Sequence, residues 1–182
     1  MPCDITTGRS EACKESVGGL RAIYIANYVD GLYPDILANL DATETITDLT
    51  TPLVLFKFEL RGENNTMEET NENSRDNGTS FWTQTVNITL KKQDAVTQLA
   101  FKELSYGRPH ILTEDYNGKF RLIGAQNGAE AAVSTSTGGA MGDLNGYNIT
   151  IEGKEISPAL FVDPAIVGAG LKFDVSTTIY NP

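Results

Sequence analysis

Several residue types that catalysis depends on are scarce in this chain. His occurs once, as His110, and no Ser or Cys stands beside it in a recognisable nucleophile motif. Ser–His and Cys–His catalysis therefore lack their general base. The Gly-x-x-x-x-Gly-Lys phosphate loop and the His-Glu-x-x-His zinc motif are both missing. The sequence predicts no enzymatic activity, no cofactor and a structural role for His110.

Cysteine is almost as rare, with Cys3 and Cys13 as the two examples. Without a Cys-x-x-Cys pair and with one His, the chain lacks the four ligands of a zinc site. We expect two free thiols, because disulfides are uncommon in reducing compartments, although a bridge between the two is the alternative. The sequence predicts no bound metal.

Long hydrophobic runs are missing as well. No apolar stretch approaches the roughly 20 residues of a membrane helix. The first residues, Met-Pro-Cys-Asp, are not a basic segment followed by an apolar one, so we expect no secretory signal peptide. The chain is predicted to be soluble where it is made and to have no membrane anchor.

Positive charge is in short supply, with 14 Lys and Arg against 24 Asp and Glu and a net charge of −10. This balance argues against binding to a phosphate backbone, which needs clustered cations. Segment 28–52 contains acids without Lys or Arg, and these are Asp30, Asp35, Asp41, Glu44 and Asp48. They form either a solvated surface or an acidic lining that repels a passing polyanion.

What the chain does contain is strand-forming sequence. In segment 53–61, Val54, Phe56 and Phe58 alternate with polar residues and predict one buried face. In segment 81–92, Trp82 falls on the same predicted inner face as Val86. Alternation and turn residues predict strands at 21–28, 53–61, 81–92, 110–116, 119–124, 130–137 and 146–156. Asn117-Gly118 is a strong signal for a hairpin between two of these strands.

One segment, 93–105, changes to helical spacing. Its predicted buried face consists of Val96, Leu99, Ala100 and Leu104. Segment 29–52, by contrast, is predicted to be mostly loop, with at most a short edge strand. The expected architecture is mainly β: an antiparallel β-sandwich or half-barrel with one flanking α-helix, formed by residues 21–156.

Three segments are not expected to join this core. Residues 1–20 read as a polar N-terminal arm, and residues 157–182 as an extended C-terminal tail with a final strand at 171–179 as an option. Residues 62–80 hold a single apolar side chain, Met67, and are too long for a tight hairpin turn. We interpret 62–80 as an extension of two strands that contacts something outside the monomer; a loose surface loop is the alternative.

Short motifs along the chain resemble the tail tube (major tail) proteins of phages. The clearest is Met141-Gly-Asp-Leu-Asn-Gly-Tyr-Asn-Ile-Thr-Ile-Glu-Gly-Lys-Glu155, followed by Pro158-Ala159 and Phe161. Further segments resemble such proteins in phages of Bacteroidetes-type hosts, namely Pro2–Thr6, Gly18–Tyr24, Ser74–Thr79 and Tyr106–His110. The tube fold is related to that of the type VI secretion tube protein, a β-sandwich or half-barrel with one flanking helix and a long loop between two long strands.

The resemblance implies a structural virion protein, made in the bacterial host cytoplasm. Subunits would form rings, commonly hexamers, that stack into the conduit for DNA ejection. DNA would pass through without specific binding, and sheath, baseplate or terminator proteins are expected partners. The residues expected in the inter-ring loop are Glu63, Asn64, Glu68, Glu69, Glu72, Arg75 and Asp76. The acids of 28–52 are the expected lumen or interface residues.

Other functions also fit a small β-rich fold. The chain could instead be a head-decorating protein, a tail terminator or a baseplate hub subunit. A carbohydrate-binding β-sandwich is a further alternative, but such a module needs aromatic rings exposed in a groove. Trp82 is the sole Trp, and the alternation places it on the same face as the expected core residues Val86, Ile88 and Leu90.

Overall fold

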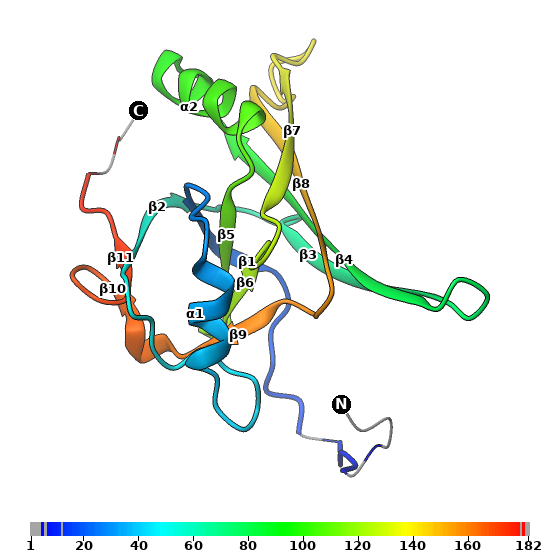
Figure 1. Ribbon diagram of the computed structural model, residues 1–182. Coiled ribbons are helices and arrows are strands. Elements are labelled where there is room, and N and C mark those ends of the chain that lie inside the picture. Colours follow the sequence, from blue (N-terminus) through cyan, green and yellow to red (C-terminus); the bar gives the residue numbers. More distant parts are fainter. Residues whose placement is uncertain (1–4, 6, 12, 179, 181–182) are drawn as a thin grey trace.

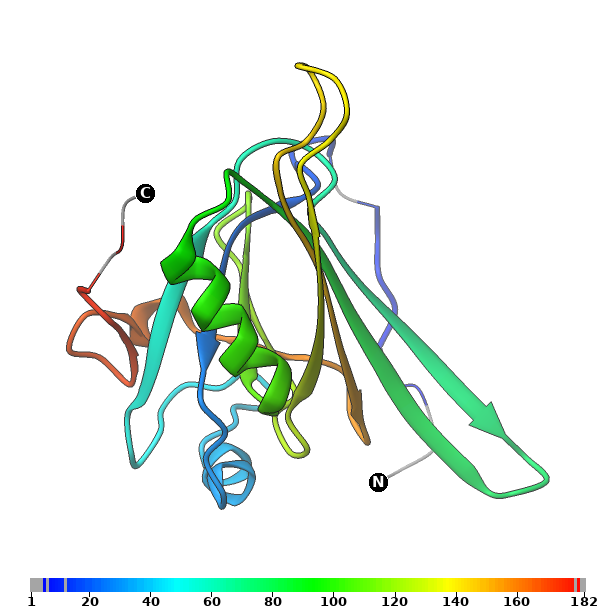
Figure 2. The same ribbon diagram turned by 90° about the horizontal axis from the view of Figure 1, so that it is seen from above.

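Two β-sheets pack face to face, and a helix is associated with each of them (Figures 1 and 2). The structure is a computed structural model that describes residues 5, 7–11, 13–178 and 180. In chain order the elements are β1 (Leu20–Ala26), α1 (Leu32–Ala38), β2 (Leu53–Glu59), β3 (Thr66–Ser74), β4 (Thr79–Lys91), α2 (Ala95–Tyr106), β5 (His110–Asp115), β6 (Phe120–Ile123), β7 (Ala129–Ser136), β8 (Gly146–Glu155), β9 (Leu160–Val162), the 3₁₀ turn η1 (Pro164–Ile166), β10 (Val167–Gly168) and β11 (Phe173–Val175).

The larger sheet has seven strands in the order β10-β11-β2-β1-β5-β6-β9 and curves into a half-barrel. The smaller sheet has four antiparallel strands in the order β3-β4-β8-β7. The predicted mainly β sandwich or half-barrel is confirmed. Most neighbouring strands are antiparallel, and the exceptions are the parallel pairs β11–β2 and β10–β11.

The first hydrophobic core lies between the two sheets. Ile23, Ile25 and Ile111 of the large sheet face Val86 and Ile149 of the small one, and all are buried. The alternation of β8 is as predicted, with Tyr147, Ile149 and Ile151 inward. Burial of these large apolar side chains is the main force that holds the sheets together.

A second core lies on the opposite face of the large sheet. There Tyr24, Leu112 and Leu122 pack against Ile36 of α1 and the buried Phe173 of β11. The helix α1 corrects the prediction of a loop in segment 29–52. Gly31 and Pro34 favour a loop, but Pro is tolerated in the first turn of a helix, and Leu32 and Ile36 anchor the helix on the sheet.

The helix α2 confirms the predicted segment 93–105, and its N-cap is Asp94, whose carboxylate accepts from the Thr97 N–H at 2.8 Å. The predicted buried face is partly wrong. Phe101 and Leu104 are buried, whereas Val96 and Leu99 are 51% and 56% exposed. The reason is that Phe101 packs between Phe58, on which it stacks at a centroid distance of 5.9 Å, and Tyr147, which it meets edge-on at 5.0 Å, so the face with Phe101 is turned to the core.

The strand β2 confirms segment 53–61, but over its first four residues the opposite face is inward. Leu53 and Leu55 are buried in the second core, while Val54 and Phe56 are 51% and 44% exposed. Both faces of this strand carry apolar side chains, so alternation alone did not decide between them. The half-buried Phe58 still packs against the first core, as predicted.

Residues 157–175 are part of the fold, which corrects the prediction of an extended tail. Strand β9 pairs with β6, and β11 pairs with β2 through Phe173 opposite Leu53. Leu160 and Val162 are buried in the second core. The predicted strand at 171–179 is therefore present in shorter form, and residue 179 lies outside the described part of the chain.

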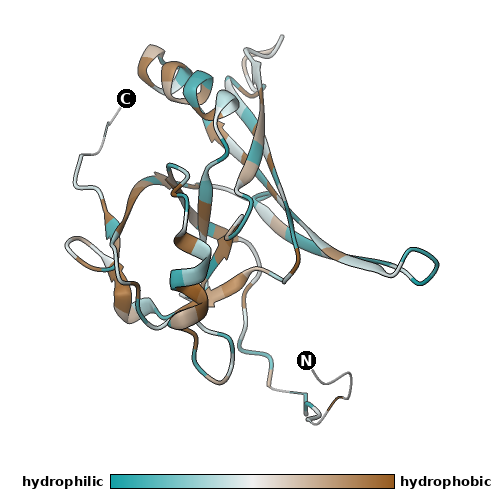
Figure 3. Cartoon of the chain, in the orientation of Figure 1, coloured by the Kyte–Doolittle hydropathy of each residue, from teal (hydrophilic) through white to brown (hydrophobic). Residues whose placement is uncertain are grey.

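The polar segment 62–80 contains a strand and a turn, and is not a loose loop. Strand β3 pairs with β4 from Thr66 opposite Asn87 to Ser74 opposite Thr79. The resulting hairpin projects far from the body of the molecule, and its tip is hydrophilic (Figures 2 and 3). Trp82, on the inner face as predicted, is half-buried because it lies near the base of the projection.

The described residues of the N-terminal segment, 5, 7–11 and 13–19, are all exposed, in agreement with an arm. The arm is attached at the turn between β5 and β6. The Asn117 side chain accepts from the Val17 N–H at 3.0 Å and donates to the Val17 carbonyl at 2.7 Å. Strands β5 and β6 themselves confirm the hairpin predicted at Asn117-Gly118.

Candidate assembly surfaces

The outward face of the four-stranded sheet is polar across all four strands. Cross-strand partners share a face, so the register defines which residues lie there. From β3 to β7 they include Thr66, Glu68, Thr70, Glu72, Thr83, Thr85, Asn87, Thr89, Lys91, Asn148, Thr150, Glu152, Lys154, Glu130, Ala132 and Ser134, and the half-buried Phe81 lies on the same face beside Glu72. The Thr150 hydroxyl donates to Asn87 at 2.9 Å, and the Thr89 hydroxyl donates to Asn148 at 3.0 Å. The sheet therefore presents a hydrated, mutually hydrogen-bonded surface.

One row across this face is acidic. Glu68 of β3 is paired with Thr85, Thr85 with Glu152 of β8, and Glu152 with Glu130 of β7. All three Glu side chains are exposed, and one cation, Lys154, lies 3.3 Å from Glu152. Like charges on directly paired residues destabilise a sheet, so Glu130 opposite Glu152 is unfavourable for the isolated monomer. Sequence reasoning selected Glu68 alone from this row, because strand alternation does not reveal which strands are neighbours.

The two sides of the four-stranded sheet differ. Strand β3 is an edge strand, and in the described part of the chain no other strand pairs with its outer side. Strand β7 forms the opposite edge, where α2 contacts it and the Gln93 side chain donates to the Ser136 carbonyl at 2.8 Å. The open backbone groups of β3 are a template for pairing with another chain.

Beyond Trp82, the β3–β4 hairpin continues without support from β8. This overhang is held by local bonds, such as that from the Thr83 hydroxyl to Glu72 at 2.8 Å. Its turn contains Arg75 and Asp76, both exposed, and its last paired residues include the half-buried Phe81. An isolated two-stranded ribbon is marginally stable in water, so the overhang is suited to docking against another surface.

A groove of about 530 Å³ lies at the other end of β4, between β2, α2 and the segment around residue 178. Its lining combines apolar side chains, among them Phe56 and Val96, with charged ones, which are the cations Lys57, Arg61, Lys91 and Lys92 and the acids Glu59 and Asp94. Arg61 is 3.7 Å from Glu59 in an exposed pair. Among the described residues, Lys91 and Lys92 have no carboxylate within 4.0 Å. The groove is thus a cationic and apolar patch on an acidic chain.

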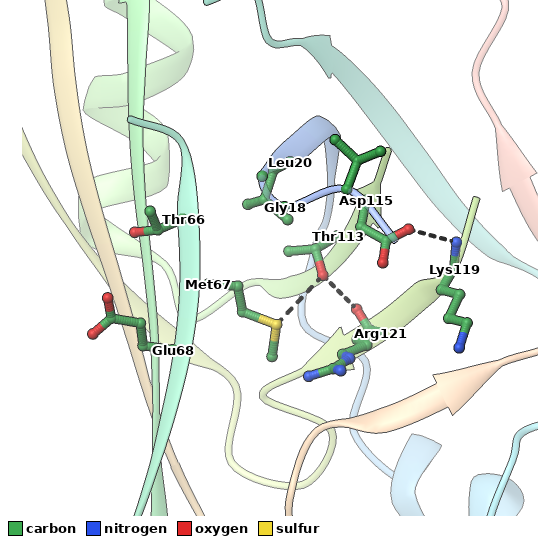
Figure 4. A pocket seen from close by; sticks show the side chains of 11 residues that line it. Gly18, Leu20, Thr66, Met67, Glu68, Thr113, Asp115, Lys119 and Arg121 are labelled. Atoms are coloured by element: carbon green, nitrogen blue, oxygen red, sulfur yellow. Dashed lines mark hydrogen bonds between the residues drawn. The ribbon is translucent and has the colours of Figure 1, made fainter. Parts of the chain in front are cut away.

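A smaller cavity of about 290 Å³ lies beneath the β3 edge (Figure 4). The Thr113 hydroxyl is 3.4 Å from the Arg121 carbonyl oxygen and 3.8 Å from the Met67 sulfur. The Asp115 carboxylate accepts from the Lys119 N–H at 2.8 Å and so stabilises the β5–β6 turn. The Asp115 carboxylate is thus engaged in the turn.

Buried polar groups join the two sheets. Gln84 of β4 donates to the Ser157 carbonyl and accepts from the Gly124 N–H, each at 3.1 Å. Glu155 of β8 accepts from the backbone N–H groups of Gln126 and Asn127 at 3.1 and 2.8 Å. Burial raises the pKa of Glu155, and these two bonds partly oppose the increase.

His110 has the structural role that the sequence predicts. Its Nδ1 is 2.7 Å from the Gly124 carbonyl and donates to it, while Nε2 accepts from the Val29 N–H at 3.1 Å. The ring stacks on Tyr28 with centroids 5.0 Å apart. Burial lowers the pKa of His110, and the bond that Nδ1 donates to the Gly124 carbonyl partly opposes this decrease. Both nitrogens are occupied, so the imidazole is not free to act as a base.

The acids predicted for a lumen or interface serve mainly local structure. Asp35 accepts from the Thr50 hydroxyl at 2.6 Å, Asp41 from the Thr45 N–H at 2.9 Å, and Asp48 lies 3.2 Å from Lys172. The bonds to Asp35 and Asp41 lower the pKa of these carboxyls, and the pKa of Asp48 is lowered first by the Leu49 N–H at 2.8 Å and then by Lys172. Asp30 and Glu44 are simply exposed. The segment covers the second core, so the whole set lies across the large sheet from the polar face of the four-stranded sheet.

The residues predicted for an inter-ring loop fall into four groups. Glu63 and Asn64 precede β3 and are exposed, whereas Glu68 and Glu72 lie on the outward face of the hairpin, and Arg75 and Asp76 are at its turn. Glu69 points inward instead. Its carboxylate lies 3.5 Å from Arg121 and accepts from the Ala159 N–H at 2.5 Å, which ties β3 to the large sheet and removes Glu69 from the available contact residues.

Cys13 is exposed and unbridged, and Cys3 lies outside the described residues. Among the described residues, no group of three or more His, Cys, Asp or Glu side chains is arranged to hold a metal ion. In the same part of the chain, neither helix has the length and apolar character needed to cross a membrane.

Comparison of the chain with protein-family models, with curated proteins and with solved structures found no match.

Proposed function

We propose that this chain is the tube-forming subunit of a phage tail or of a related injection machine. Copies form a ring, and the outward face of the four-stranded sheet lines its channel. The observation that carries the proposal is this polar face, flanked by the open edge of β3 on one side and by β7 with α2 on the other.

The unlike sides of the sheet determine how copies associate. The β3 edge of one copy meets the β7 side of the next, which buries the unpaired backbone groups of β3. A contact between two different surfaces is heterologous, and it generates a closed ring when the rotation between copies closes. Leu99 and Tyr106 of α2, the helix that contacts β7, are exposed and available to such a neighbour.

The acidic row explains why DNA can slide through such a channel. Repeated around a ring, Glu68, Glu130 and Glu152 form an anionic band that repels the phosphate backbone. The unfavourable pairing of Glu130 with Glu152 is then retained for function. In this arrangement the acidic row lines the channel in place of the acids of segment 28–52. The acids of segment 28–52 then lie on the outer side of the ring.

The proposed location is the virion tail, after synthesis in the bacterial host cytoplasm. The partners are further copies of this chain, together with sheath, baseplate or terminator proteins, and DNA passes without specific contacts. A head-decorating, terminator or hub protein is the alternative that the experiment below separates from a tube subunit.

Negative-stain electron microscopy of the purified chain at high concentration tests the proposal. Hollow rings and stacked tubes are expected. A shortened variant, lacking residues 71–74 and 79–82, keeps the 75–78 turn and removes the overhang in even steps, so the pairing of β3 with β4 stays in phase. This variant is expected to form rings that no longer stack. A wild-type chain that remains monomeric across concentration and salt would contradict the tube function.

A further inference from the structure

Strand β4 links two surfaces of opposite chemistry. Its first residue, Thr79, adjoins the hairpin tip, and its last residue, Lys91, lines the cationic groove. With 13 residues at about 3.3 Å each, β4 separates tip and groove by roughly 40 Å. Figure 2 shows the hairpin and α2, which borders the groove, on opposite sides of the molecule.

The overhang combines an acidic, hydrophilic tip with aromatic side chains nearer its base. Glu72 and Asp76 are exposed on the overhang, and one cation, Arg75, lies between them in the sequence. Phe81 and Trp82, on opposite faces of the ribbon, are half-buried although no third strand covers the residues beyond Trp82. A surface that accepts this tip therefore needs both cations and apolar side chains.

The groove offers that combination. Lys91 and Lys92 lack a carboxylate partner within 4.0 Å among the described residues, in a chain whose net charge is −10. Beside them lie Phe56, 44% exposed, and Val96, 51% exposed. Aromatic and apolar contacts surrounded by opposite charges are the usual composition of a specific protein interface.

We propose that the hairpin tip of one copy docks in the cationic groove of the next copy along the stack. Glu72 and Asp76 face Lys91 and Lys92, and an aromatic side chain of the ribbon packs against Phe56 and Val96. The proposal rests on the proposed tube function, because it names the contact by which one ring engages the next. It also limits the axial repeat of the stack to roughly 40 Å, the length of β4.

A small ligand is a weaker explanation for the groove. The groove is lined by a mixture of charged and apolar side chains from β2, β4 and α2. A second copy supplies an acidic and aromatic ribbon at the opposite end of the same strand, so a simple translation along β4 brings the two surfaces together. The association is head-to-tail and can therefore continue indefinitely, as a tube requires.

Disulfide trapping tests the contact directly. In a background with C3S and C13S, the pair N77C and V96C places one thiol at the tip and one in the groove. Within one chain the two thiols are roughly 40 Å apart and cannot bridge, because a disulfide needs Cα atoms within about 7 Å. Mild oxidation of assembled tubes is expected to give a ladder of covalent multimers. The control pair N77C and E44C, with Glu44 on the exposed loop after α1, should give none.

Charge reversal provides a second test. The variant E72K/D76K is expected to lower the fraction of subunits in stacks by about tenfold, and adding K91E/K92E to the same chain should restore stacking. The matched control D30K/E44K changes the net charge equally on the far side of the large sheet and should stack normally. Sedimentation and electron microscopy measure the fraction of subunits in stacks for the reversed variant, the doubly reversed variant and the control.

The outcomes separate the two proposals. Stacked tubes without a ladder, an equal ladder from the control pair, or undisturbed stacking in E72K/D76K would overturn the docking and leave the tube function in place. A wild-type chain that never assembles would overturn both.

Discussion

Single buried side chains, more than any surface residue, hold the strands in register. Three buried side chains bond to backbone groups that are distant in sequence. His110 bonds to Gly124 and Val29, Gln84 bonds to Gly124 and Ser157, and Glu155 bonds to Asn127. A buried polar group that loses its partner costs about 1–3 kcal/mol, so these bonds are specific as well as stabilising. The sequence predicted a structural role for His110, but its partners could not be inferred because they depend on tertiary packing.

The first prediction concerns the pH dependence of stability. Burial holds the pKa of His110 in the folded chain below its ordinary value of about 6.5, which applies to the unfolded chain. At a pH between the folded and the unfolded pKa, the unfolded chain therefore binds a proton that the folded chain does not. The free energy of unfolding should be fully developed above about pH 6.5 and should fall as the pH is lowered toward the folded pKa.

The variant H110Q keeps a polar side chain without a titrating ring. Its stability at pH 7.5 should be lower by about 1–3 kcal/mol, but its profile between pH 7.5 and 5.5 should be flatter than that of the wild type. Urea unfolding at several pH values measures both quantities. Parallel slopes in the two proteins would show that His110 is not the group responsible.

At the scale of elements, the exposed and buried faces of α2 allow a contrast. Phe101 fills the space between Phe58 and Tyr147, so F101A should cost about 3–5 kcal/mol of unfolding free energy. Leu99 is 56% exposed, so L99S should change the stability of the monomer by less than about 0.5 kcal/mol while it reduces ring formation. Urea unfolding and electron microscopy give the two readouts, and a large loss of monomer stability in L99S would contradict this account.

Elements with one clear periodicity were predictable from the sequence. The strands β5 and β6 flank an Asn-Gly turn, β8 alternates without exception from Tyr147 to Glu152, and α2 has an Asp N-cap. The faces of β2 and α2 were not predictable, because Val54 and Leu55, or Leu99 and Phe101, are equally apolar and tertiary packing decides between them. Helix α1 was missed because Gly31 and Pro34 normally mark turns.

The candidate site was predictable to a similar extent. The composition of 62–80 predicts where the long polar projection lies. It does not predict that the projection is the β3–β4 hairpin, or that Glu69 points inward. The acidic row was missed for a different reason. It combines residues of three strands, and nothing in the sequence shows that β8 lies between β4 and β7.

For the molecule as a whole, the proposed channel predicts how assembled tubes treat DNA. Glu130 and Glu152 are directly paired acids, and the variant E130K/E152K replaces both with Lys. The variant keeps a pair of like charges at this position but makes both of them positive. Tubes of this variant should form and should retain short duplex DNA at low salt, with retention lost as salt rises.

The wild type and D30K/E44K, which carries the same change in net charge, should exclude DNA from the channel. Co-sedimentation of labelled DNA with assembled tubes measures the effect. Equal retention by E130K/E152K and D30K/E44K would mean that the polar face of the four-stranded sheet is not the channel surface.

The parallel pairing of β11 with β2 also affects the order in which parts of the subunit can fold during synthesis. Phe173 lies opposite Leu53, so the backbone groups on one edge of β2 stay unpaired until residues 173–175 have been synthesised. Pairings between segments so far apart in sequence form late and slowly. Because α2 and the groove adjoin β2, a nascent chain would complete its stacking surface after its hairpin, and premature polymerisation on the ribosome would be avoided.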